Sequence, residues 1–170
     1  GLVPHALVAA LNGAHFAGHP VLHRYAQART AYVAKALGCP TLDVSSSLRP
    51  AVRALRDHEQ VLAAIDVPSD QVAASVPVQI VGMAAQVPKA LLRLAVEQKV
   101  PVTVYLTGID MDTGQRTLRI VPLPVQEDLD TLVAAVFSYL SEAIQQDSAA
   151  WHFWSEAPRF FVPPAPATAE

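Results

Sequence analysis

Apolar and polar positions alternate along the chain in patterns that predict short strands separated by helices of about ten residues. Residues 4–11 have the three- and four-residue spacing of an amphipathic helix, and residues 20–25 form a run typical of a short strand. Good helix formers over residues 28–37 stop at Gly38, which favours a helix with a glycine at its C-terminus. The chain is thus expected to begin as helix, strand, helix.

The middle of the chain predicts more strands. Residues 60–66 form a nearly continuous apolar run, which suits a strand buried on both faces of a parallel sheet. Residues 76–81 form another short strand that ends at Gly82. The other elements expected here are a strand over 41–44, a helix over 48–55 and a helix over 87–95.

The last part of the chain has the clearest signals. Residues 100–106 and 117–121 flank Asp112-Thr113-Gly114, which predicts a β-hairpin. Residues 129–144 carry apolar side chains at helical spacing, which predicts an amphipathic helix with a core-facing stripe. Beyond them Trp151 and Trp154 either close the core, which their spacing favours, or anchor the chain at a membrane interface.

Together these elements predict an α/β fold with a mostly parallel central sheet, flanked by helices, and a late β-hairpin. No internal repeat or linker divides the pattern, so we expect one domain over residues 1–160. The Pro-rich residues 161–170 are expected to form a disordered tail. The chain begins with Gly1 rather than Met, which suggests that it is truncated at its N-terminus.

Composition narrows the functional classes. The chain has 170 residues, of which 52% are apolar and 16% charged, so wholesale disorder is excluded. Its formal net charge of −3 gives no electrostatic case for binding nucleic acid. The one cysteine, Cys39, cannot form an internal disulfide and is expected to be a small buried thiol. No apolar stretch reaches the length of about 20 residues that spans a bilayer.

Candidate site residues follow from the predicted sheet, because ligands of open α/β sheets bind beyond the carboxyl ends of the strands. This rule selects His23 and Arg24 after the first strand, Asp43 after the second, and the turn from Asp66 to Asp70 after the third. Arg24 would suit a phosphate or carboxylate, and Asp66 would be a polar site residue. Alternatively, Arg24 is simply solvated and Asp66 caps a turn.

Other chemistry has weaker support in the sequence. His15, His19 and His23 are spaced by four, as zinc ligands on one helix face would be, but Gly18 and Pro20 interrupt such a helix. We therefore expect no metal site. The sequence also lacks a nucleophile elbow, a dinucleotide-binding glycine motif and a Walker phosphate loop.

Four stretches follow one another from Arg49 onward. They are the helix, strand and Asp-containing turn over residues 53–66, the strand, Gly turn and helix over residues 76–95, the hairpin over residues 100–124, and Trp151-His152-Phe153-Trp154 followed by Arg159-Phe160. In this order they resemble the bacterial lipid A biosynthesis acyltransferases, the lauroyl/myristoyl transferases of the wider glycerolipid (lysophospholipid acyltransferase-like) superfamily.

The resemblance implies transfer of an acyl chain from a thioester to a hydroxyl of a lipid or glycolipid. The donor would be an acyl-coenzyme A or an acyl-carrier protein, with no other cofactor, and the protein would lie peripherally on the cytoplasmic face of the bacterial inner membrane. Arg24 would bind an acceptor phosphate, and Asp66 would match the family's Asp-containing turn. The general base would be a His within His-x4-Asp/Glu.

That motif is not in this chain. None of the six histidines has Asp or Glu five positions later. The resemblance therefore implies that the catalytic base lies before Gly1 or has been lost. Three hypotheses stay open: an acyltransferase whose base lies outside this chain, a degenerate relative that binds an acyl chain or a protein partner without turnover, and an unrelated α/β binding module.

Overall fold

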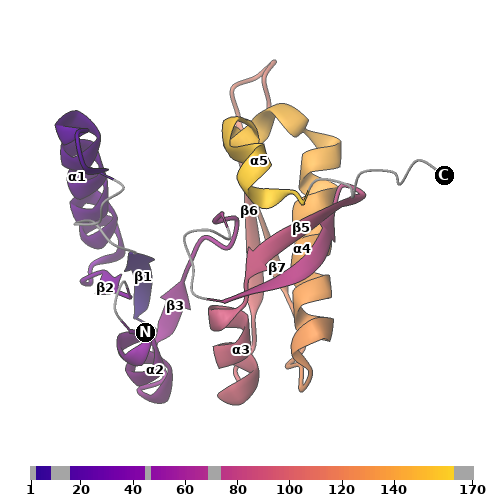
Figure 1. Cartoon of the computed structure of the whole chain (residues 1–170). Helices are drawn as coiled ribbons and strands as arrows, with labels where there is room; N and C mark the ends of the chain where they lie inside the picture. The colour runs from indigo at the N-terminus through magenta and orange to yellow at the C-terminus, as the bar shows by residue number, and fades with distance from the viewer. Residues whose placement is uncertain (1–2, 9–15, 45–46, 69–73, 163–170) are drawn as a thin grey trace. The chain divides into compact units, whose positions relative to one another are not determined.

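The computed structural model describes residues 3–8, 16–44, 47–68 and 74–162, and its contacts divide the chain into two compact units, Gly1–Ala64 and Ile65–Glu170 (Figure 1). The first unit contains β1 (Pro4–Val8), α1 (Pro20–Leu37), β2 (Leu42–Asp43), α2 (Arg49–Arg56) and β3 (Gln60–Leu62). The second contains β4 (Ser75–Ile80), β5 (Met83–Pro88), α3 (Ala90–Glu97), β6 (Thr103–Ile109), β7 (Arg116–Pro122), α4 (Leu129–Gln146), the 3₁₀ turns η3 (Ser148–Ala150) and η4 (His152–Glu156), and α5 (Ala157–Phe160).

The first unit is a small parallel sheet in the order β2-β1-β3. Leu7 pairs with Leu42 and His5 pairs with Val61, so the central strand is β1. Helices α1 and α2 make the crossovers that parallel neighbours require. Helix α1 starts with proline in its first turn and ends at Gly38 in the left-handed region (φ 71°), as the sequence predicts for its C-terminus.

Polar contacts tie the strands of this sheet to the loops around them. The ring of His5 contacts two acceptors, the Glu59 carboxylate through Nε2 at 3.0 Å and the Pro40 carbonyl through Nδ1 at 2.9 Å. The Cys39 thiol donates a hydrogen bond to the Pro4 carbonyl at 2.7 Å. Among the described residues of this unit, the fully buried apolar side chains are small alanines on α2, so these contacts matter for its cohesion.

The second unit contains two antiparallel hairpins. Strands β4 and β5 are joined by a two-residue turn in which Val81 and Gly82 both have positive φ, 48° and 79°. Two positive φ values in a two-residue hairpin loop are the signature of a type I′ turn, whose twist matches that of the strands. Strands β6 and β7 pair over seven residues each, around the turn that contains Gly114. This second hairpin is the late hairpin that the sequence predicts.

Helix α4 organises the core of the second unit. Its stripe of Leu132, Val133, Val136, Phe137 and Ile144 is buried, which confirms the core-facing stripe expected over residues 129–144. The Asp128 carboxylate caps its N-terminus by accepting a hydrogen bond from the Thr131 N–H at 2.7 Å. The stripe packs against inward residues of the β4–β5 hairpin, α3 and the C-terminal aromatic residues.

The expectation of a mostly parallel central sheet is wrong. The fold is mixed α/β, with a parallel sheet of three short strands and two separate antiparallel hairpins. The main cause is the tight turn at Val81-Gly82, which reverses the chain so that residues 83–88 form β5. The helix expected from Val87 therefore starts only at Ala90, as α3, after the chain has left the hairpin.

Three shorter segments also differ from expectation. Residues 4–8 are a strand rather than a helix, and residues 20–25 are the first turns of α1 rather than a strand. Short apolar runs of this kind fit the periodicity of a helix as well as that of a strand. Residues 4–8 are a strand because they pair with both β2 and β3. The strand expected over residues 60–66 stops at Leu62.

The single domain expected over residues 1–160 stays a prediction. In the segment expected to be a tail, Phe161 bridges to Ala85 and the Val162 N–H donates to the Ala84 carbonyl, while residues 163–170 lie outside the described part. No helix among the described residues has the length and apolar character needed to cross a bilayer.

Candidate functional site

An open groove of about 760 Å³ lies between β4 and α4, within the second unit. One wall is the strand and its turn, and the other is a face of the helix. The lining consists of Val76, Pro77, Val78, Gln79, Val81 and Gly82 from the hairpin, and Asp130, Val133, Ala134, Phe137, Ser138, Ser141, Glu142 and Gln145 from α4.

Helical spacing explains how α4 forms its wall. The lining positions recur every three or four residues from Asp130 to Gln145, so they share one long face of the helix. Val133 and Phe137 also belong to the buried core, while Ala134 and Ser138 are exposed. The groove is therefore apolar at its floor and bordered by small and polar side chains on the helix side.

The strand wall is the edge of β4 opposite β5, which pairs with no other strand among the described residues. A two-residue turn closes on a hydrogen-bonded pair, which is Ile80 with Met83, and such pairs alternate with non-bonded ones along an antiparallel ladder. Pro77 pairs with Gln86 at a non-bonded position, so its backbone faces away from β5, toward the free edge. Proline has no N–H, so this edge offers an interrupted row of donors to an added strand.

One end of the groove is fixed by a contact between hairpin and helix. The Val81 N–H donates a hydrogen bond to the Ser141 hydroxyl at 3.2 Å. Val81 is β-branched and lies at φ 48°, a conformation that costs an L-residue roughly 1–2 kcal/mol. The hydrogen bond from α4 thus holds a strained turn in place at the groove's border.

The charges around the groove are largely satisfied. Glu142 accepts a hydrogen bond from Arg119 on β7 at 3.1 Å and a second from Gln146 at 3.0 Å. The Arg119 guanidinium also lies 5.5 Å from the centre of the Tyr139 ring. These contacts link β7 to α4, and Asp130 is a second carboxylate of the lining, which is exposed.

Asp66, a site residue expected from the sequence, lies four residues beyond the end of β3. Its carboxylate accepts a hydrogen bond from the indole Nε1 of Trp151 at 3.3 Å. Burial raises the pKa of Asp66 above its ordinary value of 3.8, while hydrogen bonds from its own backbone N–H and from Trp151, and the charge of His152, act in the opposite direction. The contact joins two of the four stretches on which the resemblance rests.

Trp151 is the centre of an aromatic cluster. It is 6% exposed, and the rings of Phe153, Trp154, Phe160 and Phe161 lie against it edge-on at centroid distances of 4.9–6.4 Å. Trp151 therefore closes the core. The sequence left open whether Trp151 and Trp154 would close the core or anchor the chain at a membrane interface. Trp154 is 42% exposed and donates its indole hydrogen bond to the Ser148 carbonyl at 2.6 Å.

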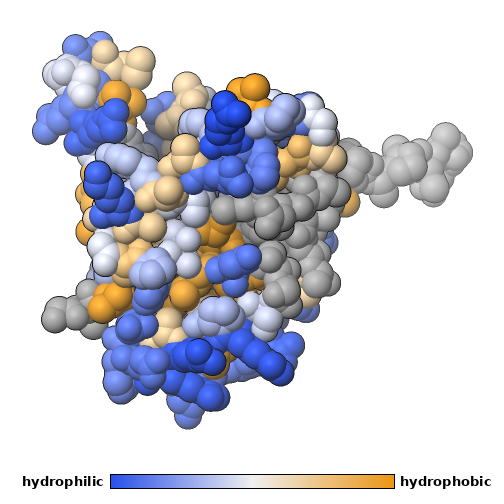
Figure 2. Space-filling model, turned by 90° about the vertical axis from the view of Figure 1, so that its left-hand side faces the viewer, coloured by the Kyte–Doolittle hydropathy of each residue, from blue (hydrophilic) through white to orange (hydrophobic). Residues whose placement is uncertain are grey.

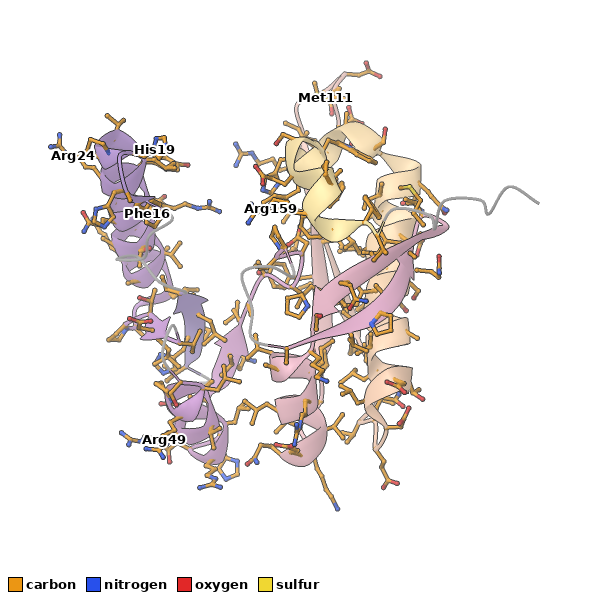
Figure 3. The ribbon with its side chains drawn as sticks, in the orientation of Figure 1. Phe16, His19, Arg24, Arg49, Met111 and Arg159 are labelled. Atoms are coloured by element: carbon orange, nitrogen blue, oxygen red, sulfur yellow. The ribbon has the colours of Figure 1, made fainter. Side chains whose placement is uncertain are left out.

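The structure does not bring the sequence-predicted site residues together at the end of a sheet. Arg24 lies on α1, not after a strand, and Figure 3 shows its side chain projecting away from the helix. Asp43 ends β2 and is exposed, and His23 stacks on Phe16 at a centroid distance of 5.2 Å. Arg24 belongs to the first unit and Asp66 to the second.

The histidines expected not to form a metal site are only partly described. His19 precedes α1 and His23 lies on it, whereas His15 is outside the described residues, as is Asp70 of the predicted site turn. No group of three His, Cys, Asp or Glu side chains suited to a metal ion occurs in the described part of the chain.

Sequence reasoning missed the groove, although a signal for it is present. Ala134, Ser138 and Ser141 form a stripe of small side chains beside the apolar stripe of the same helix. Small residues on a helix face leave room beside it. Nothing in the local pattern, however, indicates that β4 would lie alongside this face, since that depends on the turn at residues 81–82.

No protein-family model matches the chain, and neither does any curated protein.

Proposed function

We propose that the chain is an acyltransferase-like protein that binds the acyl chain of a thioester donor in the groove between β4 and α4. The observation that carries the proposal is the groove itself, which combines an apolar floor of Val133 and Phe137 with a strand wall of Val76 and Val78. Hydrocarbon is the ligand chemistry that such a surface favours, because burying each methylene contributes about 0.8 kcal/mol.

The strand wall favours hydrocarbon over a peptide. A peptide that adds to a sheet edge needs a continuous row of backbone donors and acceptors. Pro77 interrupts that row at the middle of β4. An acyl chain makes no hydrogen bonds along its length, so the interruption costs it nothing.

The length of the groove also fits an extended acyl chain. Its helix wall runs from Asp130 to Gln145, and a rise of 1.5 Å per residue gives about 22 Å. Asp130 and Gln145, at the two ends of this wall, are polar and exposed. A thioester head group would therefore lie at the solvent side while its chain follows the floor.

The sequence resemblance supports the wider reaction. It suggests that the acyl chain passes from coenzyme A or a carrier protein to a hydroxyl of a lipid or glycolipid, at the cytoplasmic face of the inner membrane. Arg24 is the residue proposed to bind an acceptor phosphate, and Asp66 the one proposed to belong to the acceptor turn. The hydrogen bond between Asp66 and Trp151 brings together two of the stretches that carry the resemblance.

A second candidate function is binding without turnover. It is favoured by one specific observation, the lack of an acidic residue five positions after any histidine. Without a general base the acceptor hydroxyl would keep its proton and attack slowly. Both candidates require the groove to bind an acyl thioester, and they differ in whether a transfer follows.

The test measures binding of lauroyl-coenzyme A to the whole chain by isothermal titration calorimetry. Ala134→Trp would fill the groove from an exposed position on α4, and we expect it to weaken binding by roughly 10- to 100-fold, since several methylenes lose contact. Ala31→Trp, at an exposed position of α1, is the matched control and should bind like the parent.

A parent chain without affinity for lauroyl-coenzyme A would contradict the proposal, and so would equal binding by the two tryptophan variants. Transfer to lysophosphatidic acid, followed by mass spectrometry, then separates the candidates. This second assay uses the full-length product of the gene, because the resemblance places the general base outside this chain. Product formation by that protein supports the acyltransferase, whereas tight binding by it without product supports the non-catalytic relative.

A further inference from the structure

Helix α1 has an exposed apolar stripe. Val21, Tyr25, Ala28, Tyr32 and Ala36 recur at spacings of three and four and therefore share one face of the helix. Val21 is 82%, Tyr25 61% and Tyr32 72% exposed, and both alanines are exposed as well. No residue of α1 is fully buried. An exposed face of this composition marks an interaction surface.

The charges on α1 are all of one sign. Arg24 and Lys35 border the stripe on one side and Arg29 borders it on the other, as follows from the 3.6-residue period. The helix contains no Asp or Glu, although the whole chain has a net charge of −3. Among the described residues, no carboxylate oxygen lies within 4.0 Å of these three cations. They are thus available to an anionic partner.

A second copy of the chain does not fit this surface. A two-fold symmetric pair would place the same face of both helices together. Arg24, Arg29 and Lys35 of one copy would then approach the same cations of the other, with no acidic side chain on either helix to separate them. The partner must instead carry negative charge and accept apolar and tyrosine side chains.

We propose that α1 lies on an anionic lipid surface, with its Val21–Ala36 stripe in the acyl boundary and its cations at the headgroups. Exposed apolar residues bordered by Lys and Arg are one feature of helices that bind in the plane of a membrane interface. Tyrosine suits that position because its ring is apolar and its hydroxyl stays hydrated. The choice of lipid over an acidic protein rests on the proposed function, whose acceptor is a lipid.

Figure 2 shows one face of the molecule, on which orange apolar residues are interspersed with blue hydrophilic ones. Apolar residues surrounded by charges are the pattern expected of a reversible surface contact. Anchoring of this kind would combine burial of the apolar stripe with attraction between the cations and the anionic headgroups. Each Lys or Arg near an anionic surface adds about 1 kcal/mol.

The experiment uses the whole chain and vesicles of phosphatidylglycerol and phosphatidylcholine in equal parts, with co-sedimentation as the readout. The variant R24Q/R29Q/K35Q should bind roughly 100-fold more weakly, at about fivefold per cation. The matched control is R49Q/R53Q/R56Q, which removes three cations from α2, a helix that carries no large exposed apolar side chain. It should bind nearly as well as the parent.

A second measurement does not depend on how the two triple substitutions affect folding. Tyr25→Trp should show a blue shift of its fluorescence with the anionic vesicles, and almost none with vesicles of phosphatidylcholine alone, because the indole enters the interface. No binding by the parent, equal losses in the two triple variants, or an unshifted emission would each overturn the proposal. Lauroyl-coenzyme A binding, measured without vesicles, tests the proposed function separately.

Discussion

At the scale of single residues, Asp66 is a carboxyl group of the second unit whose pKa is raised by burial. It is partly buried beside an aromatic cluster, and the Trp151 indole is its side-chain donor. Burial penalises the charged form, so the folded protein holds the Asp66 proton to a higher pH than the unfolded chain does. Asp66 therefore makes the stability of the protein depend on pH.

The sign of this dependence gives a prediction. Because the folded pKa of Asp66 is raised, its contribution to stability is fully present below the unfolded pKa of 3.8 and is lost as the pH rises through the folded pKa. Compared with Asp66→Asn, the parent should thus lose free energy of unfolding as the pH rises above about 4. Urea unfolding of both proteins at a series of pH values measures the difference.

Asp128 provides a control with the opposite sign. Hydrogen bonds from Thr131 lower the pKa of this helix-capping carboxyl group. Its contribution is therefore present above the unfolded pKa and is lost as the pH falls through the folded pKa, so the parent should lose stability relative to Asp128→Asn only below about pH 4. Parallel pH profiles for the two variants would contradict this account.

At the scale of elements, the contact between the β4–β5 turn and α4 is decisive for the groove. The Val81 N–H would lack its partner if the Ser141 hydroxyl were removed. Because Val81 already has an unfavourable φ, the turn has little capacity to rearrange without loss of stability.

Ser141→Ala should therefore lower the free energy of unfolding by about 1 kcal/mol, the net effect of leaving a partly buried N–H unpaired. Ser138→Ala is the matched control, since Ser138 lines the same groove but its hydroxyl contacts only the Ala135 carbonyl of its own helix. Its free energy of unfolding should change by less than about 0.5 kcal/mol. Equal effects in chemical denaturation would show that the turn does not depend on α4.

Elements with strong local signals could be predicted from the sequence. Helix α4 has a sustained apolar stripe, and the β6–β7 hairpin has the Asp112-Thr113-Gly114 turn between two alternating runs. The β4–β5 hairpin could not be predicted in this way, because Val81 is an atypical residue for a position with positive φ. Strand β1 was ambiguous because five apolar-rich residues are compatible with a helix or a strand. Its pairing with β2 and β3 is what makes this segment a strand.

The candidate site was less predictable than the fold. Asp66 was identified from its position after an apolar run, and its burial beside Trp151 comes from a contact 85 residues away in sequence. Arg24 was selected by a strand-end rule that does not apply to it, since it lies within a helix. The groove depends on the meeting of β4 with α4, which no local pattern encodes.

At the scale of the whole molecule, burial is distributed unevenly between the two units. The large buried side chains, among them Phe137, Phe160 and Ile80, belong to the second unit. In the first unit α1 has no fully buried residue, and α2 buries only alanines. Local stability follows buried apolar contact, so the two units should differ in their resistance to opening.

Amide hydrogen exchange measures this difference. The amides in the middle of α4 should exchange at least about a hundredfold more slowly than those in the middle of α1, although both helices have 18 residues. The equal lengths make the two helices a matched comparison, because intrinsic helix formation contributes similarly to both. Similar protection in the two would show that α1 has a stabilising partner in solution.

Helix α4 contributes one face to the core and another to the groove, and this has a consequence for how the protein can evolve. Ala134 and Ser138 face the groove without taking part in the buried core, whereas Leu132 and Val136 do the reverse. Replacements at the first pair would alter the cavity while leaving the fold's stability almost untouched. Selection could therefore retune ligand preference through a few positions of one helix, and relatives with the same architecture are expected to diverge first along that face.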